Sequence, residues 1–225
     1  PEERAEALAD AADRSEDAPV KVRLYCRAAE VFRDRLNTPD RAVKSFERAA
    51  AVDPENADVA RALIPLYRGS EKWGRLLAAY ETVLQRVAVA AERSALLTDI
   101  RQLCEQQLGS RQLAFEWCAK AFAESPNDAA LRTELERLAT ASESWEELLQ
   151  IFVRRLRDGD RGGAERRALL HRAAEISRNK LHRADEALGF YRELLEADDT
   201  DRSVLDLLAE MFQSEQRWSD LPDVY

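Results

Sequence analysis

The sequence predicts an all-α protein, an α-solenoid in which antiparallel helical hairpins repeat along the chain. The first observation is a Trp-x-x-Leu motif at Trp73, Trp145 and Trp218, which recurs at an almost constant interval. So regular a period is the signature of repeats that bury their apolar faces against their neighbours. The second is an apolar spacing of three and four residues, which is the period of a helix. The third is a low content of glycine and proline, 7 of each in 225 residues, which disfavours a turn-rich β protein.

The whole chain, residues 1–225, is expected to be a single array that begins and ends inside a repeat. Residues 1–19 correspond to the last helix of a preceding repeat and its loop, with Pro1 at the tryptophan position. Because these residues begin inside a repeat, we expect the natural N-terminus to lie further upstream. Tyr225 corresponds to Tyr80, after which the helix continues, so we expect the last repeat to be truncated. The boundaries between these ends are 20–90 for repeat 1, 91–163 for repeat 2 and 164–225 for repeat 3.

Repeat 1 is predicted to contain four helices, each with one apolar stripe. The first ends before Pro39 and the second at Asp53, because a residue that precedes proline is pushed out of the helical region. The third ends at Gly69, and Trp73 begins the fourth. The stripes are Leu24, Ala28, Val31 and Leu36; Ala42, Phe46 and Ala49; Val59, Ala62, Leu63 and Leu66; and Leu76, Leu77, Tyr80 and Leu84.

The same stripes recur in repeats 2 and 3 when each position is shifted by the interval between successive motif tryptophans. The second interval is longer than the first by a single residue. This extra residue falls between Leu156 and Leu169, where the glycine-containing segment 158–163 accepts an insertion at little cost. The repeat 2 positions are Leu96, Ile100, Leu103 and Leu108; Ala114, Cys118 and Ala121; and Leu131, Leu135 and Leu138. The repeat 3 positions are Leu169, Ala173, Ile176 and Leu181; Ala187, Tyr191 and Leu194; and Val204, Leu208 and Met211.

The hairpin from Ala28 to Pro54 resembles a tetratricopeptide repeat, and the chain is similar to a bacterial-type array with alternating Trp-x-x-Leu hairpins. The resemblance implies a right-handed superhelix of about thirteen helices that serves as a non-catalytic scaffold for protein–protein interaction. The alternate hairpins depart from the family, because leucine replaces its small alanine at Leu76, Leu148 and Leu221. The matching positions are Ala42, Phe46, Ala49 and Pro54; Ala114, Cys118, Ala121 and Pro126; and Ala187, Tyr191 and Leu194, with Asp199 at the proline position.

The half-a-tetratricopeptide repeat is a second resemblance, and it would imply a component of an RNA-processing assembly. In that family the tryptophan lies in the first helix of a hairpin. In this chain Trp73 and its two copies begin the second helix, so we weight this alternative less.

Composition and charge exclude several classes of function. A formal net charge of -9 disfavours nucleic acid as a partner, and disfavours an anionic membrane surface. No stretch approaches 18 apolar residues, and residues 1–20 lack a signal peptide, so no direct membrane insertion is expected. The three cysteines, Cys26, Cys104 and Cys118, form no CxxC pair, which favours reduced thiols and a cytoplasmic location.

The sequence contains no pattern typical of an enzyme, and we expect no catalytic residue, no metal and no cofactor. Its two histidines, His171 and His182, lack metal-ligand spacing, and neither nucleotide-binding glycine motif is present. Cys118 occupies a core position, whereas Cys104 is expected to be the more exposed thiol. The three repeated tryptophans are predicted to be buried anchors between adjacent hairpins, with an exposed row of binding aromatics as the alternative.

In the family that the chain resembles, the first helix of each hairpin lines a concave groove. Transferred by register, this face would carry seven arginines and four aromatic residues in an otherwise acidic chain. Arginine and aromatic side chains anchor protein interfaces, so the predicted partner is a protein or peptide segment with acidic and apolar residues. The predicted groove residues are Tyr25, Phe32, Arg33, Tyr67, Arg68, Arg101, Arg132, Arg167, Arg178, Arg202 and Phe212.

Two alternatives to this groove remain open. The arginines could instead pair with acidic residues on neighbouring helices, and we give this the same weight as partner binding. At the level of function, the alternative is a structural element that self-associates through open terminal repeats.

Overall fold

The computed structural model describes residues 1–158, 163–197 and 201–214, with side chains to Phe212. These residues form helices and contain no strand. The predicted thirteenth helix, which Trp218 would begin, lies outside the described residues. The helices are α1 (Glu2–Arg14), α2 (Ala18–Asp34), α3 (Pro39–Val52), α4 (Ala57–Gly69), α5 (Trp73–Arg86), α6 (Ala90–Gln106), α7 (Arg111–Glu124), α8 (Ala129–Ser142), α9 (Trp145–Asp158), α10 (Ala164–Asn179), α11 (Ala184–Ala197) and α12 (Arg202–Ser214).

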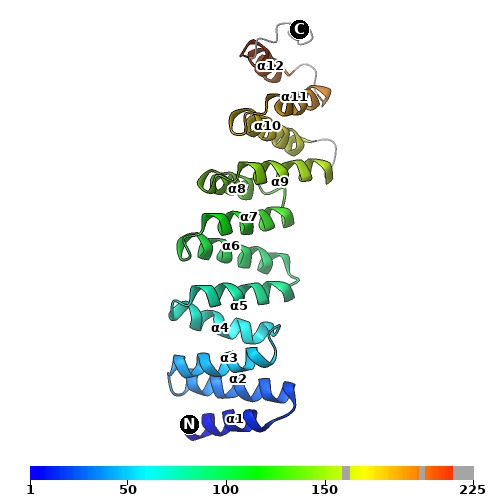
Figure 1. Cartoon of the computed structure of the whole chain (residues 1–225). Helices are drawn as coiled ribbons and strands as arrows, with labels where there is room; N and C mark the ends of the chain where they lie inside the picture. The colour runs from blue at the N-terminus through cyan, green and yellow to red at the C-terminus, as the bar shows by residue number, and fades with distance from the viewer. Residues whose placement is uncertain (159–162, 198–200, 215–225) are drawn as a thin grey trace. The chain divides into compact units, whose positions relative to one another are not determined.

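The chain divides into two compact parts, Pro1–Trp117 and Cys118–Tyr225, which we call the N-terminal and C-terminal parts. In the N-terminal part α2 pairs with α3 and α4 with α5 as antiparallel hairpins, and in the C-terminal part α8 pairs with α9 and α10 with α11 (Figure 1). We call α2, α4, α6, α8, α10 and α12 the first helices, and α3, α5, α7, α9 and α11 the second helices. The all-α hairpin array predicted from the sequence is confirmed.

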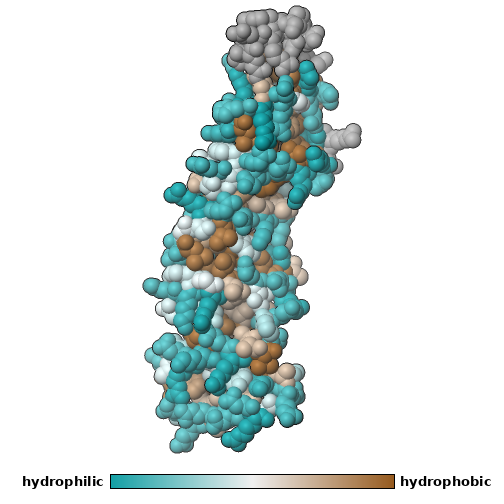
Figure 2. Space-filling model, in the orientation of Figure 1, coloured by the Kyte–Doolittle hydropathy of each residue, from teal (hydrophilic) through white to brown (hydrophobic). Residues whose placement is uncertain are grey.

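Small residues allow the helices of the N-terminal part to approach closely. Ala5 on α1, Ala28 on α2 and Ala42 on α3 have no exposed surface, and they form one core cluster with Phe32. An alanine removes little side-chain freedom on burial and leaves room for the neighbouring helix. Hydrophilic side chains cover most of the visible outer surface over α1 to α3 (Figure 2).

The predicted stripe positions form the core of the C-terminal part as well. Leu135 and Leu138 of α8 are fully buried, and so is Leu148 of α9. Phe152 of α9 meets Phe122 with the ring centroids 6.1 Å apart and the planes inclined at 59°. Such a tilted arrangement is favourable for two aromatic quadrupoles.

The turn inside each predicted repeat adopts the same backbone conformation three times. Asn37, Gly109 and His182 have φ angles of 50°, 63° and 55°, which lie in the left-handed region. One residue later, the amide donates a hydrogen bond to a carbonyl six residues back: Thr38 to Phe32 at 2.8 Å, Ser110 to Cys104 at 2.9 Å and Arg183 to Ser177 at 2.8 Å. The three positions are separated by the same two intervals as the motif tryptophans, so the backbone follows the register found in the sequence.

An arginine of the following helix binds the end of each helix that a described Trp-x-x-Leu motif begins. Arg93 of α6 donates from Nη1 to the carbonyls of Leu84 at 2.8 Å and Val87 at 3.0 Å. Arg166 of α10 donates from Nη1 to the carbonyl of Leu156 at 2.6 Å. The last carbonyls of a helix have no partner within it, so these guanidinium groups satisfy acceptors that would otherwise need water.

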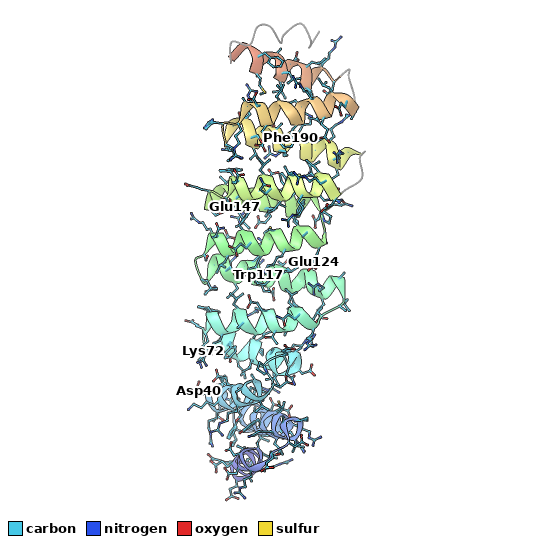
Figure 3. The ribbon with its side chains drawn as sticks, turned by 45° about the vertical axis from the view of Figure 1, so that its right-hand side comes forward. Asp40, Lys72, Trp117, Glu124, Glu147 and Phe190 are labelled. Atoms are coloured by element: carbon cyan, nitrogen blue, oxygen red, sulfur yellow. The ribbon has the colours of Figure 1, made fainter. Side chains whose placement is uncertain are left out.

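The tryptophans at the helix starts are less buried than expected. Trp73 and Trp145 are only half buried, which corrects the expectation of buried anchors, and Trp218 lies outside the described residues. The Lys180 ammonium group lies 4.8 Å from the centre of the Trp145 ring, a cation–π contact at the surface. Among the described tryptophans the buried one is Trp117, which is not part of the repeated motif. Asp40 lies in the first turn of α3, and Lys72 immediately precedes α5. Their side chains lie along one edge of the N-terminal part (Figure 3).

Candidate functional site

The predicted groove residues all lie on first helices, as the register required. Because the two parts of the chain are separate units, each has its own first-helix face. The N-terminal part carries Tyr25, Phe32 and Arg33 on α2, Tyr67 and Arg68 on α4, and Arg101 on α6. The C-terminal part carries Arg132 on α8, Arg167 and Arg178 on α10, and Arg202 and Phe212 on α12.

The four aromatic residues of the predicted groove are core residues. Tyr25, Phe32, Tyr67 and Phe212 are between 4% and 6% exposed. The physical reason is that a first helix such as α2 contacts the helix before it, α1, as well as its own partner α3, so it buries a broad stripe. These rings therefore pack in the core beneath the first-helix face, and the arginines form the exposed part of that face.

Two buried tyrosines of the N-terminal part bind carboxylates on the preceding helix. The Tyr25 hydroxyl donates to Asp13 Oδ1 at 2.5 Å, and the Tyr67 hydroxyl donates to Glu47 Oε1 at 3.0 Å. Burial, together with the hydrogen bond and the charge of Glu47, raises the pKa of Tyr67 to about 12. Burial and then the hydrogen bond to Asp13 also raise the pKa of Tyr25.

Each of these carboxylates also pairs with an arginine from the next second helix. Arg48 of α3 lies 3.4 Å from Asp13, and Arg75 of α5 pairs with Glu47. A third group of the same kind contains Tyr80, Asp99 and Arg68. Each group contains a tyrosine, a carboxylate and an arginine and joins three successive helices, and we call these groups the tyrosine trios.

Sequence reasoning did not find the tyrosine trios. In the trios of Tyr25 and Tyr67, the carboxylate precedes its arginine in the sequence by about one helix–turn–helix unit. Acidic and basic residues at that separation are therefore the sequence signal that could have indicated these pairs. Such a search needs the hairpin geometry to decide which of the many acidic and basic residues face one another.

The predicted arginines are exposed or half buried in the described residues, and several pair with acids. Arg68 lies 3.6 Å from Asp99 of α6, while Arg33 pairs at 2.7 Å with its own neighbour Asp34. In the C-terminal part Arg178 of α10 lies 3.8 Å from Glu210 of α12. Arg132 is half buried, and Arg202 is exposed. Pairing within the array therefore occurs for at least part of the set.

These pairs leave the arginines available to a ligand. The side chains of Arg68 and Asp99 retain 59% and 49% of their surface, and those of Arg33 and Asp34 retain 37% and 54%. Exposed ion pairs contribute only about 0–1 kcal/mol, because water screens both charges. A carboxylate from a partner that binds bidentately can therefore displace an internal acid at small cost.

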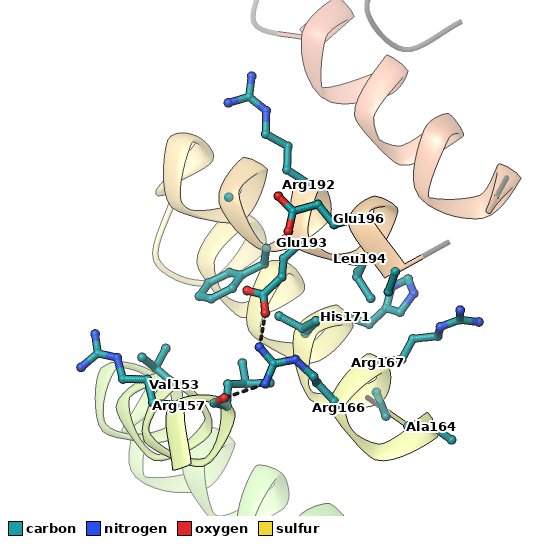
Figure 4. A pocket seen from close by; sticks show the side chains of 17 residues that line it. Val153, Arg157, Ala164, Arg166, Arg167, His171, Arg192, Glu193, Leu194 and Glu196 are labelled. Atoms are coloured by element: carbon teal, nitrogen blue, oxygen red, sulfur yellow. Dashed lines mark hydrogen bonds and ion pairs between the residues drawn. The ribbon is translucent and has the colours of Figure 1, made fainter. Parts of the chain in front are cut away.

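Two pockets in the described residues are lined mostly by side chains outside the predicted groove. In the C-terminal part a pocket is formed by the end of α9, the start of α10 and the exposed side of α11 (Figure 4). Of the predicted groove residues, Arg167 lines it. In the N-terminal part a shallower pocket lies between α1 and α3, and Phe32 reaches it from α2. Second helices supply much of both pockets, and no site is predicted from the sequence on these helices.

One of the cysteine side chains is placed differently from expectation. Cys104 is fully buried, as is Cys118, so the expectation that Cys104 is the more exposed thiol is wrong. Cys26 is half buried, and burial, with the charges of Glu30 and Asp58, raises its pKa to about 11. Among the described residues no three His, Cys, Asp or Glu side chains gather as a metal site. None of the described helices is both long and apolar enough to cross a lipid bilayer.

Comparison with known proteins gives only distant likenesses. No protein-family model matches the sequence, and no curated protein matches it. The chain is similar to the solved structure of YrrB, described as a TPR protein with an unusual peptide-binding site, at 17% identity and a TM-score of 0.38 over 90% of this chain and 98% of that one. It is also similar to a tetratricopeptide repeat protein from Parabacteroides merdae, at 16% identity and a TM-score of 0.42 over 94% and 79% of the two chains. For the TPR protein TTC0263 of Thermus thermophilus the values are 18%, 0.35, 85% and 99%.

Proposed function

We propose that this protein is a non-catalytic scaffold that binds an acidic segment of a partner protein on the first-helix face. The observation that carries the proposal is the placement of Arg33, Arg68 and Arg101 on three successive first helices of one compact part. The direct ion pairs Arg61–Glu92 at 3.0 Å and Arg68–Asp99 at 3.6 Å bring α4 and α6 together on this side.

The chemistry of the face favours carboxylates as ligands. Guanidinium groups bind carboxylates through two parallel hydrogen bonds, and arginine is enriched where interfaces have energetic anchors. Each helix contributes its arginine from a rigid element whose core side, for example Tyr67 on α4, is held by a tyrosine trio. A rigid row of cations reduces the ordering cost of binding an extended acidic segment.

The test is affinity capture with this chain as bait, followed by measurement of the affinity of a captured partner. The variant carries Arg33→Gln, Arg68→Gln and Arg101→Gln, which removes three charges while keeping most of each side-chain stem. We expect at least tenfold weaker binding, because three charge-assisted contacts are lost.

The matched control carries Arg4→Gln, Arg23→Gln and Arg27→Gln, which removes three exposed arginines from the same part of the chain. It has the same net charge as the first variant, so a general electrostatic effect would weaken both equally. Equal affinities for the wild type and the first variant would overturn the proposed face. Light scattering on the same samples would show whether the captured partner is a second copy of this chain.

A further inference from the structure

The pocket formed by α9, α10 and α11, which we call the α9–α11 pocket, has a local charge opposite to that of the whole chain. Its charged lining consists of four arginines and two glutamates, in a protein with a formal net charge of -9. These residues are Arg157, Arg166, Arg167, Arg192, Glu193 and Glu196 (Figure 4).

One of these arginines has a structural role. Arg166 binds the carbonyl of Leu156 at 2.6 Å and pairs with Glu193 of α11, which holds the three helices together. Its equivalent in the previous repeat, Arg93, binds the carbonyl of Leu84 in the same way. Arg166 and Arg93 therefore have the same structural role at two successive junctions between repeats.

The other three arginines are particular to this pocket. In the register of the repeats, Arg157 corresponds to Gln85, Arg167 to Ser94 and Arg192 to Ala119. The same helical elements therefore form with neutral residues at these positions, so the hairpin fold does not require the three charges. Arg157 and Arg192 are exposed, and their side chains extend outward from α9 and α11 into solvent (Figure 4).

A glycine in the wall of the pocket is the second observation. Gly189 lies inside α11, where glycine costs roughly 0.5–1 kcal/mol relative to alanine. A Cβ at this position would meet no atom within 4 Å, so the fold gives no steric reason for the glycine. Because Gly189 has no side chain, the surface of α11 is uncovered next to the half-buried ring of Phe190. The equivalent residue in the previous repeat is Glu116.

We propose that the α9–α11 pocket is a second binding site, which takes an acidic and apolar segment of a partner protein. Carboxylates of the segment pair with Arg157 and Arg192, and an apolar side chain lies on Phe190 where Gly189 leaves space. The apolar wall and the two glutamates favour a peptide over a polyphosphate, which offers no apolar group and carries a denser negative charge. The proposal rests on the proposed function as a binder of protein segments, but it uses the second-helix side of the chain.

The probe is a short fluorescein-labelled peptide that alternates aspartate with leucine, followed by fluorescence anisotropy. We expect saturable binding to the wild-type chain, at least tenfold weaker binding of the same peptide with asparagine in place of aspartate, and about tenfold weaker binding to the Arg157→Gln/Arg192→Gln double variant. Inorganic phosphate, compared with chloride at equal ionic strength, is the competitor. Displacement by phosphate at the same concentration as by the unlabelled peptide would show a simple anion site and overturn the proposal.

Gly189→Gln separates binding from folding. The new side chain fills the space beside Phe190, while a better helix former replaces glycine, so we expect a higher melting temperature together with loss of peptide binding. Gly74→Gln is the control, because Gly74 also lies in a helix with nothing within 4 Å of an added Cβ. It should leave the peptide affinity unchanged. Wild-type affinity of the Gly189→Gln variant would overturn the proposal.

The Arg33→Gln/Arg68→Gln/Arg101→Gln variant distinguishes this proposal from the proposed function. Its substitutions disable only the first-helix face of the N-terminal part, so the probe binding that this variant retains comes from the pocket, and adding Arg157→Gln and Arg192→Gln to it should remove that binding. If that variant loses a captured partner while the pocket variants retain both partner and probe, the first-helix face stands and the pocket proposal fails.

Discussion

At Tyr67 a phenol hydroxyl, a carboxylate and a guanidinium group meet between three helices. The hydroxyl of α4 donates to Glu47 of α3, which also accepts from Arg75 of α5. The carboxylate is therefore satisfied by two donors, and the buried hydroxyl has an acceptor, so neither polar group pays the cost of an unmet hydrogen bond. Residues of this kind position the surface above them, because they set how α3, α4 and α5 lie against one another.

The Tyr67 trio predicts how stability depends on alkaline pH. The pKa of Tyr67 is raised to about 12, above the value near 10 of an unfolded tyrosine, so its contribution is fully present below pH 10. Between about pH 10 and 12 the unfolded chain loses this proton first, and we expect the wild type to lose up to about 2 kcal/mol there from this residue. Tyr67→Phe should lower stability by about 1 kcal/mol at pH 7 and show a flatter decline above pH 10. Urea unfolding of both proteins at several pH values measures the difference, and parallel declines would contradict it.

Cys26 gives a prediction about thiol reactivity. Its pKa, raised to about 11, leaves about a hundredfold less thiolate at neutral pH than the ordinary value of 9.0 would. The rate of alkylation of the native protein by iodoacetamide should rise about tenfold per pH unit and continue to rise beyond pH 9, with Cys104 and Cys118 modified only after unfolding. Mass spectrometry of the modified peptides identifies each site. Glu30→Gln is the control and should lower the pKa, since the Glu30 charge raises it.

At the scale of the element, the hairpin turn shows how a repeat tolerates different residues in one conformation. Asn37, Gly109 and His182 occupy equivalent left-handed positions, and the hydrogen bond that follows has nearly the same length in each turn. Glycine adopts this conformation without steric cost, whereas asparagine and histidine, although enriched in it, carry a Cβ that strains it. The turn is therefore locally preferred in repeat 2, and the packed helices help to hold it in repeats 1 and 3.

Reciprocal substitutions test this view of the turn. His182→Gly should raise the free energy of unfolding by about 0.5–1 kcal/mol, because it removes the left-handed strain of a residue with a Cβ. Gly109→His should lower it by a similar amount, since the space around Gly109 is open and strain is the main effect. Thermal and urea unfolding of the two variants provide the values. A change of the same sign in both would contradict the assignment.

At the scale of the whole molecule, the chain consists of hairpins that contact their neighbours in sequence. The contacts recorded within each part join successive helices, such as α2 with α3, α3 with α4 and α4 with α5. An array of this kind stores its stability in local interfaces rather than in one central core. Each part therefore exposes several helix faces, which suits a protein whose proposed role is to bind other proteins.

The array predicts a local response to a core defect. Phe46 is 2% exposed, and Phe46→Ala should cost about 3–5 kcal/mol in the free energy of unfolding of the N-terminal part. Because repeats interact mainly with their neighbours, amide hydrogen exchange should accelerate most in α2 to α5 and least around Leu148 and Phe152. Exchange measured by mass spectrometry on wild type and variant gives the comparison. Uniform acceleration over both parts would show instead that the chain unfolds as one cooperative unit.

Helical spacing predicts many of the buried residues correctly, but not all of them. Helical spacing predicts that Ala42, Phe46 and Ala49 lie in the core, and they are buried, as are Leu135 and Leu138 in repeat 2. The predicted surface was less accurate, because Tyr25 and Tyr67 lie one position beside the stripe and are also buried. A helical period locates the centre of a buried face but not its width, which depends on how many neighbours a helix has.

The helical class, the hairpin register and the row of arginines on the first helices could be predicted from residue spacing, because a helix period and a repeat interval are one-dimensional properties. The packed structure shows which charges pair, as Arg68 does with Asp99, and which arginine binds a helix end, as Arg166 does. It also decided that Arg157 and Arg192 border the same pocket, although they lie on different helices. The reason is physical: ion pairs and pockets depend on distances of a few ångströms between helices, and those distances are set by the combined packing of side chains from several elements.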